Sequence, residues 1–504
     1  MDGSTAQPQS SQIPDLVKIG SVSTDTAINV QTDILDPVIF SQSEARFVLE
    51  NKGILHSNSR ITFSTQGDSM AGAGATGRSF YPANIGINSV IQRCSLRVGT
   101  KTLCEIEDYG HFAAYESCFL PTDAVKEREQ VLTGKYLTTA PGILNRSTPY
   151  ASGSNVANLS ESNTAAESIK IDNAKNATLH PSTIGAYYET INNASAQVAQ
   201  GIVWDWQNEV NKPTYSILLA DLFPFLKMNQ LPLFMMNEQV SIHLTFAPRI
   251  TDDANASAST RICKSNGATL ATDITLTRPD CQLIADYIFY PQEMMEQYRQ
   301  ANANMSFQYV DYQFVKRTVA AAEFNNGLIQ NIGGAGRIVN KCFVMANVEL
   351  AAPANTLLND YVAEGPTVDA AGTGQVTVNL KYNDNFLYPI DVSNNARHYH
   401  NVFSAEGRMP YICRDCYRGE GLLAASGGTV DGNTDFEGYS ASTELKQHQF
   451  YTAYRLNKGE RVNSRGIELY DTRNPMTAPT TFRAYLQVVK VAALRDGIMS
   501  IQFA

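Results

Sequence analysis

The chain has 504 residues, of which 43% are hydrophobic and 17% charged, and its formal net charge is −10 at pH 7. This length exceeds what one hydrophobic core supports, so we expect more than one domain. The acidic balance and the absence of a basic block argue against a surface that neutralises nucleic-acid phosphates.

The N-terminal residues lack the basic region and apolar core of a secretory signal. No apolar run approaches the ~18–20 residues that would span a bilayer. We therefore expect a soluble protein that is synthesised in the cytosol. The eight cysteines are scattered along the chain, which is typical of free thiols rather than of a disulfide scaffold.

The first 36 residues are polar and predict an N-terminal arm that is ordered only by contact with another molecule. Alternating apolar residues then predict strands over 46–49, 60–63, 90–98 and 102–106. Short helices are expected over 109–116 and 122–132.

Residues 139–200 are rich in Asn, Ala, Ser and Thr and carry few large apolar side chains, so we expect a long surface insertion. Beyond it, Leu231–Met236 is apolar without any period. The next residues alternate strictly and predict a strand with one buried face, formed by Val240, Ile242, Leu244 and Phe246.

The second half repeats the strand-rich pattern after Pro291, which begins a short predicted helix over 291–298. Strands are predicted before it over 283–289 and after it over 307–317, 338–350, 375–382, 450–455 and 482–491. The last residues alternate as well, at Met499, Ile501 and Phe503. Two blocks of similar strand number predict an all-β chain of two antiparallel sandwiches or barrels in tandem.

Candidate metal and phosphate sites are incomplete. Cys413 and Cys416 form a lone CxxC, which supplies half of a zinc site, and His398 with His400 is read as one face of a strand. The segment Gly333–Arg337 precedes a strand and lacks the Lys-Ser/Thr pair of a phosphate loop, so it predicts a hairpin turn.

Catalytic signatures are also missing, since no GxSxG, HExxH or Cys-His pattern occurs. Two carboxylate pairs could serve a glycosidase, but strand and helix surfaces produce such pairs routinely: Glu105 with Glu107, and Glu293 with Glu296. Trp204 and Trp206 fit an aromatic core or subunit interface, or alternatively a sugar platform. Six sequons are attributed to the Asn-rich composition, at Asn145, Asn158, Asn176, Asn193, Asn255 and Asn304. The sequence thus assigns no catalytic, cofactor-binding or metal-ligating residue.

Four segments resemble the double jelly-roll major capsid proteins of eukaryotic double-stranded DNA viruses, a lineage of large DNA viruses, virophages and polinton-like viruses. The stretch LIADYIFYPQEMMEQYRQANANMSFQYVDYQF looks like the junction between the two jelly rolls. DLFPFLKMNQLPLFMMNEQVSIHLTF is similar to the end of the first roll, and NDNFLYPIDVSNNARHYHNVFS to a loop and helix of the second. YLQVVKVAALRDGIMSIQFA is similar to the terminal strand pair.

The resemblance implies two tandem eight-stranded antiparallel jelly rolls with short helices in the connections. After the arm at 1–36, the first roll would cover 37–290, a linker helix 291–304 and the second roll 305–504. It also implies a non-enzymatic structural protein without cofactors that forms homotrimers. Each trimer would be a pseudo-hexameric hexon of the icosahedral capsid, and Leu231–Met236 would be a contact surface at or beneath the trimer interface.

The implied partners are further copies of the chain and the penton, minor capsid and cement proteins of the same virion, without direct nucleic-acid binding or membrane insertion. Two other hypotheses stay open. A carbohydrate-active β-sandwich protein, either a lectin or a glycosidase, would use the tryptophans and loop carboxylates. A spike or penton protein would fit one roll plus extensions, whereas the sequence shows two strand-rich blocks.

Overall fold

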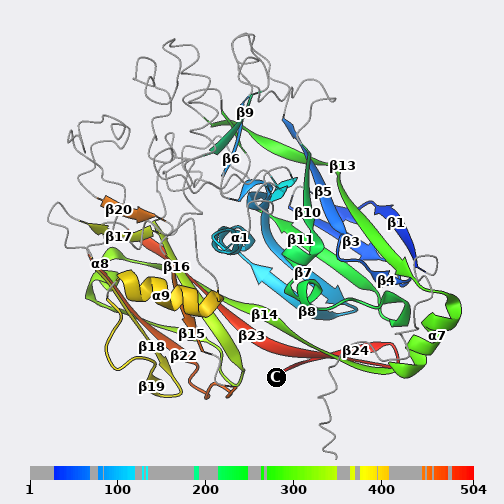
Figure 1. Ribbon diagram of the computed structural model, residues 1–504. Helices are drawn as coiled ribbons and strands as arrows, with labels where there is room; N and C mark the ends of the chain where they lie inside the picture. Colours follow the sequence, from blue (N-terminus) through cyan, green and yellow to red (C-terminus); the bar gives the residue numbers. More distant parts are fainter. Residues whose placement is uncertain are drawn as a thin grey trace, which may run out of the picture.

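A computed structural model gives the fold of the chain. It describes residues 28–41, 43–67, 78–82, 85–119, 128–129, 132–133, 187–191, 214–247, 263–265, 270–348, 364–368, 375–393, 395–407, 445–448, 451–456, 459–474 and 479–504. Two β-rich halves lie side by side, with the N-terminal half to the right in Figure 1 and the C-terminal half to the left.

Two antiparallel sheets make up the first half, which we call roll one. Within the described residues, one sheet contains the order β1-β13-β5-β10 and the other the order β3-β11-β7-β8. These strands are β1 (Asn29–Leu35), β3 (Glu44–Leu49), β5 (Arg60–Gly67), β7 (Ile91–Val98), β8 (Lys101–Glu107), β10 (Thr214–Leu218), β11 (Val240–Phe246) and β13 (Leu270–Phe289).

The second half, which we call roll two, is built in the same way. Its two sheets have the orders β14-β23-β16-β21 and β15-β22-β18-β19. These strands are β14 (Asn304–Val319), β15 (Leu328–Gly333), β16 (Val339–Val348), β18 (Gln375–Tyr382), β19 (Asn385–Phe386), β21 (Thr452–Arg455), β22 (Ile467–Asn474) and β23 (Thr480–Arg495).

The strand order is identical in the two rolls. If these eight strands of each roll are counted in chain order, one sheet reads 1-8-3-6 and the other 2-7-4-5 in both halves of the described chain. Eight strands wound between two sheets in this way form a jelly roll. The predicted all-β fold of two tandem jelly rolls is therefore confirmed by the hydrogen-bonded pairing itself.

Most of the additional short strands extend these sheets, whereas β17 and β20 pair with each other in a separate two-stranded sheet, and short helices connect the strands. The additional strands are β2 (Ile39–Phe40), β4 (Ile54–Leu55), β6 (Arg78–Pro82), β9 (Tyr187–Ile191), β12 (Cys263–Ser265), β17 (Glu364–Val368), β20 (Leu445–His448) and β24 (Ile498–Phe503). The helices are η2 (Gly86–Val90), α1 (Tyr109–Ser117), α5 (Leu219–Leu222), α6 (Pro224–Met228), η5 (Leu233–Met235), α7 (Gln292–Ala301), α8 (Ala321–Asn326) and α9 (Asn395–Glu406). None of the helices in the described residues is long and apolar enough to cross a membrane.

Strand β11 shows how the sequence pattern produces a sheet. Val240, Ile242, Leu244 and Phe246 are buried in the core, and β11 pairs with β3 on one side and β7 on the other. Because successive side chains of a strand point to opposite faces, this alternation fixes the register of a sheet with one buried face. The predicted strand over these residues is confirmed.

Several strands depart from the sequence-based expectations. β1 lies inside the segment that was predicted as an arm, and among the sixteen strands of the two rolls β10, β15, β19 and β22 were not predicted. The exposed edge position of β1 leaves most of its side chains in solvent, so it lacks the apolar signal of a core strand. The predicted helix over 122–132, apart from residues 128, 129 and 132, and the insertion over 139–200, apart from β9, lie outside the described residues.

Gly53 is required where β3 leaves its sheet and β4 begins. Its φ is +55°, and a Cβ there would lie 2.8 Å from the backbone oxygen of Ile288. Gly336 has a φ of +71°, but a Cβ there would meet no atom within 4 Å. We predict that Gly336→Ala lowers the free energy of unfolding by only ~1–2 kcal/mol, which is the strain of an alanine in the left-handed conformation. Gly53→Ala should lower the free energy of unfolding by more, because its Cβ would also clash with the backbone oxygen of Ile288. Scanning calorimetry of both variants measures this, and equal losses of melting temperature would contradict it.

Candidate functional site: the junction of the two rolls

Helix α1 of roll one lies between the two rolls (Figure 1). It follows β8 directly, through Asp108, whose left-handed backbone (φ 49°) turns the chain into the helix. Eight of its nine residues are buried. A helix that is buried on nearly every side must be enclosed by other elements. The aromatic spacing of Tyr109, Phe112 and Tyr115 and the small residues Ala113 and Ala114 allow this close packing.

The aromatic residues of α1 pack on roll two. The ring of Tyr115 stacks on that of Phe343, with centroids 3.7 Å apart and an angle of 5°. Phe343 in turn lies 4.8 Å from Tyr485, and Phe112 meets Tyr312 edge-on at 4.6 Å. Pairs of this kind contribute about 0.5–1.5 kcal/mol each beyond the burial of their area. The helix is thereby held against strands β14, β16 and β23.

A buried ion pair lies at the N-terminal end of the same helix. The Asp108 carboxylate accepts a hydrogen bond of 2.8 Å from Nε of Arg483 and lies 2.7 Å from Nδ1 of His111. The Tyr485 hydroxyl donates to the backbone oxygen of Asp108 at 2.9 Å. Burial opposes ionisation of Asp108, but His111 and Arg483 outweigh it and hold the pKa of its carboxyl below the usual range. Roll one and roll two therefore share a charged contact that excludes water.

A second charged contact lies near the other end of α1. The Tyr115 hydroxyl donates to Oε1 of Glu406 at 2.6 Å, and Nζ of Lys341 lies 2.6 Å from both carboxylate oxygens of Glu406. Glu406 ends helix α9, and Lys341 belongs to β16. One carboxylate therefore joins a helix of roll one to a helix and a strand of roll two.

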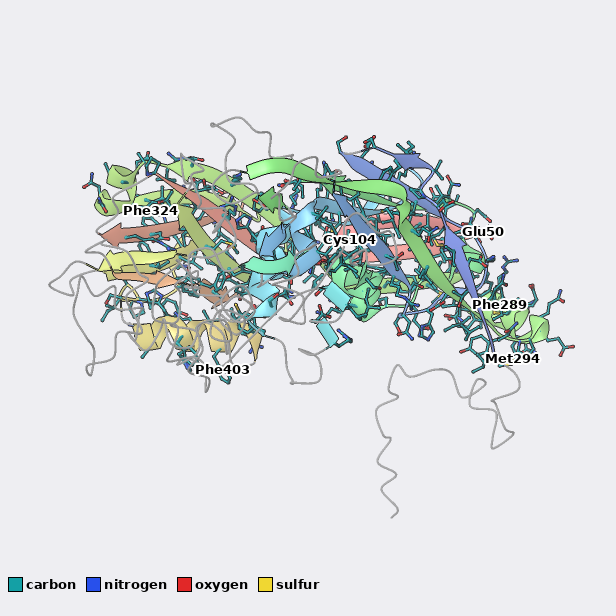
Figure 2. All side chains as sticks on the ribbon, turned by 90° about the horizontal axis from the view of Figure 1, so that it is seen from above. Glu50, Cys104, Phe289, Met294, Phe324 and Phe403 are labelled. Atoms are coloured by element: carbon teal, nitrogen blue, oxygen red, sulfur yellow. The ribbon has the colours of Figure 1, made fainter. Side chains whose placement is uncertain are left out.

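The edges of two sheets meet below α1, where β8 of roll one runs beside β14 of roll two. The Tyr309 hydroxyl donates to the backbone oxygen of Leu103 at 2.6 Å, and the backbone N–H of Glu105 donates to Asp311 at 3.1 Å. Asp311 also forms an ion pair with Lys490. Burial nevertheless raises the pKa of the Asp311 carboxyl, because it outweighs the attraction of Lys490. Figure 2 shows β8, marked by Cys104, near the middle of the molecule.

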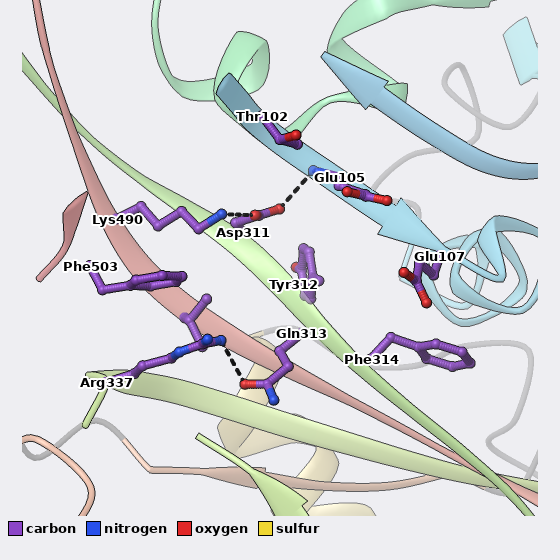
Figure 3. A pocket seen from close by; sticks show the side chains of 11 residues that line it. Thr102, Glu105, Glu107, Asp311, Tyr312, Gln313, Phe314, Arg337, Lys490 and Phe503 are labelled. Carbon is purple, nitrogen blue, oxygen red and sulfur yellow. Dashed lines mark hydrogen bonds and ion pairs between the residues drawn. The ribbon is translucent and has the colours of Figure 1, made fainter. Parts of the chain in front are cut away.

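We call the contact between β8 and β14 the seam. A cavity of about 280 Å³ opens beside it, between β8, β14, β23 and β24. Figure 3 shows that residues of both rolls line it. The Arg337 guanidinium lies 4.1 Å from the ring centroid of Phe503 and donates to Gln313 at 2.8 Å. Of the lining carboxylates, Glu105 is ion-paired with Arg93 and Asp311 with Lys490. The Glu105 carboxylate is therefore held within roll one and the Asp311 carboxylate at the junction, and these two do not stand free as an acid and base pair.

The structure separates most of the residues that the sequence singled out. His398 and His400 lie on helix α9 and not on a strand, with His398 buried and His400 exposed, so the interpretation as one strand face was wrong. Glu293 and Glu296 are exposed on α7. Within the described part of the chain, no three His, Cys, Asp or Glu side chains gather to hold a metal ion. The predicted turn at Gly333–Arg337 is present and has left-handed glycines, but the prediction of a hairpin was wrong, because the turn joins β15, which pairs with β22, to β16, which pairs with β21 and β23 in the other sheet.

Several other candidates fall outside the described residues, namely Cys413, Cys416, Trp204, Trp206 and the sequons Asn145, Asn158, Asn176, Asn193 and Asn255. Asn304 is described and is exposed at the start of β14. The prediction of free thiols is confirmed for five described cysteines, which are buried: Cys94, Cys104, Cys118, Cys281 and Cys342.

The expectation that Leu231–Met236 forms a contact surface was wrong. Leu231, Leu233, Met235 and Met236 are each at most 6% exposed within the single chain. The segment packs in the core of roll one, and the Leu231 backbone oxygen accepts a hydrogen bond from Leu55. Its apolar composition is explained by intrachain burial, so it carries no argument for or against self-association.

Comparisons with known proteins give matches of structure. No family model matches the chain, and no curated protein does. One similar solved structure is the PBCV-1 virus capsid, with a TM-score of 0.49 at 11% identity over 95% of this chain and 97% of that chain. Another comes from the Sputnik virophage, with a TM-score of 0.47 at 10% identity over 94% of this chain and 88% of that chain. The mavirus major capsid protein gives a TM-score of 0.42 at 10% identity over 100% of this chain and 96% of that chain. The first of these structures is a virus capsid, the second a virophage particle and the third a major capsid protein.

We predict that Asp108→Asn lowers the free energy of unfolding by about 3–5 kcal/mol, because it breaks the buried ion pair of Asp108 with Arg483. Asparagine keeps the left-handed backbone preference of Asp108, so the loss would report the charge. The exposed pair of Asp384 with Arg465 provides the matched control, and Asp384→Asn should cost no more than ~1 kcal/mol. Denaturant unfolding at pH 7 measures both.

The same pair predicts an acid dependence. A carboxyl whose folded pKa is depressed contributes stability above its unfolded pKa of about 3.9, and this contribution is lost as pH falls through the folded pKa. The difference in stability between the original chain and Asp108→Asn should therefore shrink below about pH 4. A difference that is constant from pH 7 to pH 3 would contradict the assignment.

Proposed function

We propose that this chain is the major capsid protein of an icosahedral double-stranded DNA virus. The observation that carries the proposal is the rigid joining of two jelly rolls of identical strand order in one chain. Three such chains, each with two equivalent lobes, form a pseudo-hexameric capsomer, and blocks of six-lobed outline tile a closed shell. The chain acts by shape and contact and performs no catalysis.

The composition supports this role. A net charge of −10 keeps the protein soluble and away from nucleic acid before assembly. The proposed location is the outer shell of the virion, after synthesis in the host cytosol. Penton, minor capsid and cement proteins of the same virion are the proposed neighbours, in addition to further copies of the chain.

The proposed division of the chain keeps the boundaries of the sequence analysis with one change. The first roll extends from 37–290 backward to include β1, because β1 pairs with β13 along its whole length. The helix at 291–304 and the second roll at 305–504 are retained. The segment before β1 and the insertion at 139–200 are proposed to face the inside and the outside of the shell, respectively.

We predict that the purified chain forms one trimeric species of about 166 kDa, three times the 55.2 kDa of one chain. Size-exclusion chromatography with light scattering measures this mass, and dilution should leave it unchanged. A monomer near 55 kDa at all concentrations would contradict the proposal. The carbohydrate-active alternative is tested with a glycan array and a panel of chromogenic glycosides. We expect no binding on the array and no hydrolysis in the panel.

A further inference from the structure

Three basic side chains gather on the outer face of one sheet of roll one. Strand β11 lies between β3 and β7, and the sequence neighbours of His243 on β11 are buried in the core. Because side chains alternate along a strand, His243 belongs to the opposite face. Arg46 of β3 lies directly across from His243, and Arg97 of β7 lies across from Ser241, one diagonal step away. We call Arg46, Arg97 and His243 the basic cluster.

The basic cluster has no acidic partner. Within the part of the chain that the structure describes, neither Arg46 nor Arg97 forms an ion pair or a side-chain hydrogen bond. Glu44 shares their face two positions along β3, but it is exposed and also forms no ion pair in the described residues. The remaining arginine on this face of β7, Arg93, is already paired with Glu105. Two positive charges therefore stand side by side without compensation.

The two arginines also leave hydrogen-bond donors unused. Both are half-buried, and the Nε atom of each is buried without a hydrogen-bond partner. A buried donor that lacks an acceptor costs free energy, and the cost is larger for a charged group. By contrast, the Nε atom of Arg483 donates to Asp108 at 2.8 Å. An acceptor with negative charge is therefore what Arg46 and Arg97 lack.

His243 reports the positive field of the cluster. Its Nε2 atom lies 3.0 Å from the Ser241 hydroxyl. Burial, and then the positive charges of Arg97 and Arg46, lower the pKa of His243 to about 4. The ring is therefore neutral at pH 7. Because both guanidinium groups act on one ring, both lie close to it, on either side of β11.

We infer that the basic cluster is a binding site for a small tetrahedral oxyanion of the phosphate class. The guanidinium group presents a fork of donors that matches phosphate oxygens. Adjacent strands lie about 4.8 Å apart, so Arg46 and Arg97 start about 10 Å apart and their long side chains can hold one anion between them, above β11.

Two arginines suit a single phosphate group and not the row of phosphates of a nucleic acid, which agrees with the net charge of −10. All members of the cluster belong to roll one. The inference is therefore independent of the proposed function, which rests on the joining of the two rolls.

A ligand site differs from a structural ion pair in its effect on stability. Without the anion, the repulsion between Arg46 and Arg97 and their unused donors oppose folding. Removal of one arginine should then leave the fold as stable as before or more stable. Bound anion reverses the balance, because a ligand that binds only the folded chain stabilises it.

The experiment uses the full chain and two cluster variants, Arg46→Gln and Arg97→Gln. Arg60→Gln is the matched control, because Arg60 is a half-buried arginine on β5, in the other sheet of roll one, and forms no ion pair among the described residues. Titration calorimetry with inorganic phosphate, at an ionic strength held constant with chloride, measures binding. Scanning calorimetry gives each melting temperature with and without phosphate.

We expect the original chain and Arg60→Gln to bind phosphate equally well. Each cluster variant should bind it about tenfold more weakly or worse, because one charge-assisted set of hydrogen bonds is lost. Without phosphate, the cluster variants should melt no lower than the original chain. Phosphate should raise the melting temperature of the original chain by more than that of either cluster variant.

Three results would overturn the inference: no phosphate binding by the original chain, equal binding by the cluster variants, or cluster variants that melt lower than the original chain without phosphate. The last result would show that the arginines are structural. Glycerol 3-phosphate as a second probe identifies the source of the anion. Binding of both probes supports a site that accepts a phosphate ester, and binding of inorganic phosphate alone supports a site for the free anion.

Discussion

The packing of helix α1 against the aromatic face of roll two is the contact on which the rest of the structure depends. The helix is buried on nearly every side, stacked on Phe343 and held at its N-terminal end by the pair of Asp108 and Arg483. A hinge between the rolls would separate the stacked rings and expose or isolate buried charges, which is costly. The two rolls therefore behave as one block with a fixed angle.

A fixed angle is what a repeating assembly requires. When each chain contributes two lobes of the same topology, the relation between the lobes inside a chain can be repeated between chains, and the repetition closes only if that relation does not vary. The buried polar groups at the junction suit this role, since hydrogen-bonded charges in a dry interface impose direction as well as contact. Apolar packing alone would tolerate sliding of one roll on the other.

Much of the fold could be predicted from alternation, as at Val240–Phe246, where a one-residue shift would expose the whole apolar set. Strand β22 was not predicted because Asp471 and Arg473 are buried in it as an ion pair. Their charged side chains made two core positions look solvent-facing in the sequence. Strand β1 was not predicted because most side chains of this edge strand lie in solvent, so its sequence lacks a clear alternation of apolar residues. The junction could not be predicted, because its partners across the two rolls are 200 or more residues apart, as for Asp108 and Arg483.

The central claim is that two jelly rolls of one strand order, held at a fixed angle, make this chain the repeating unit of a closed capsomer. Electron cryomicroscopy of the purified oligomer, at a resolution that separates strands, tests it most directly. The account predicts a closed ring of six lobes from three chains, with the same angle between the two rolls in every chain. Particles without a closed six-lobed outline, or rolls at varying angles within one chain, would contradict it.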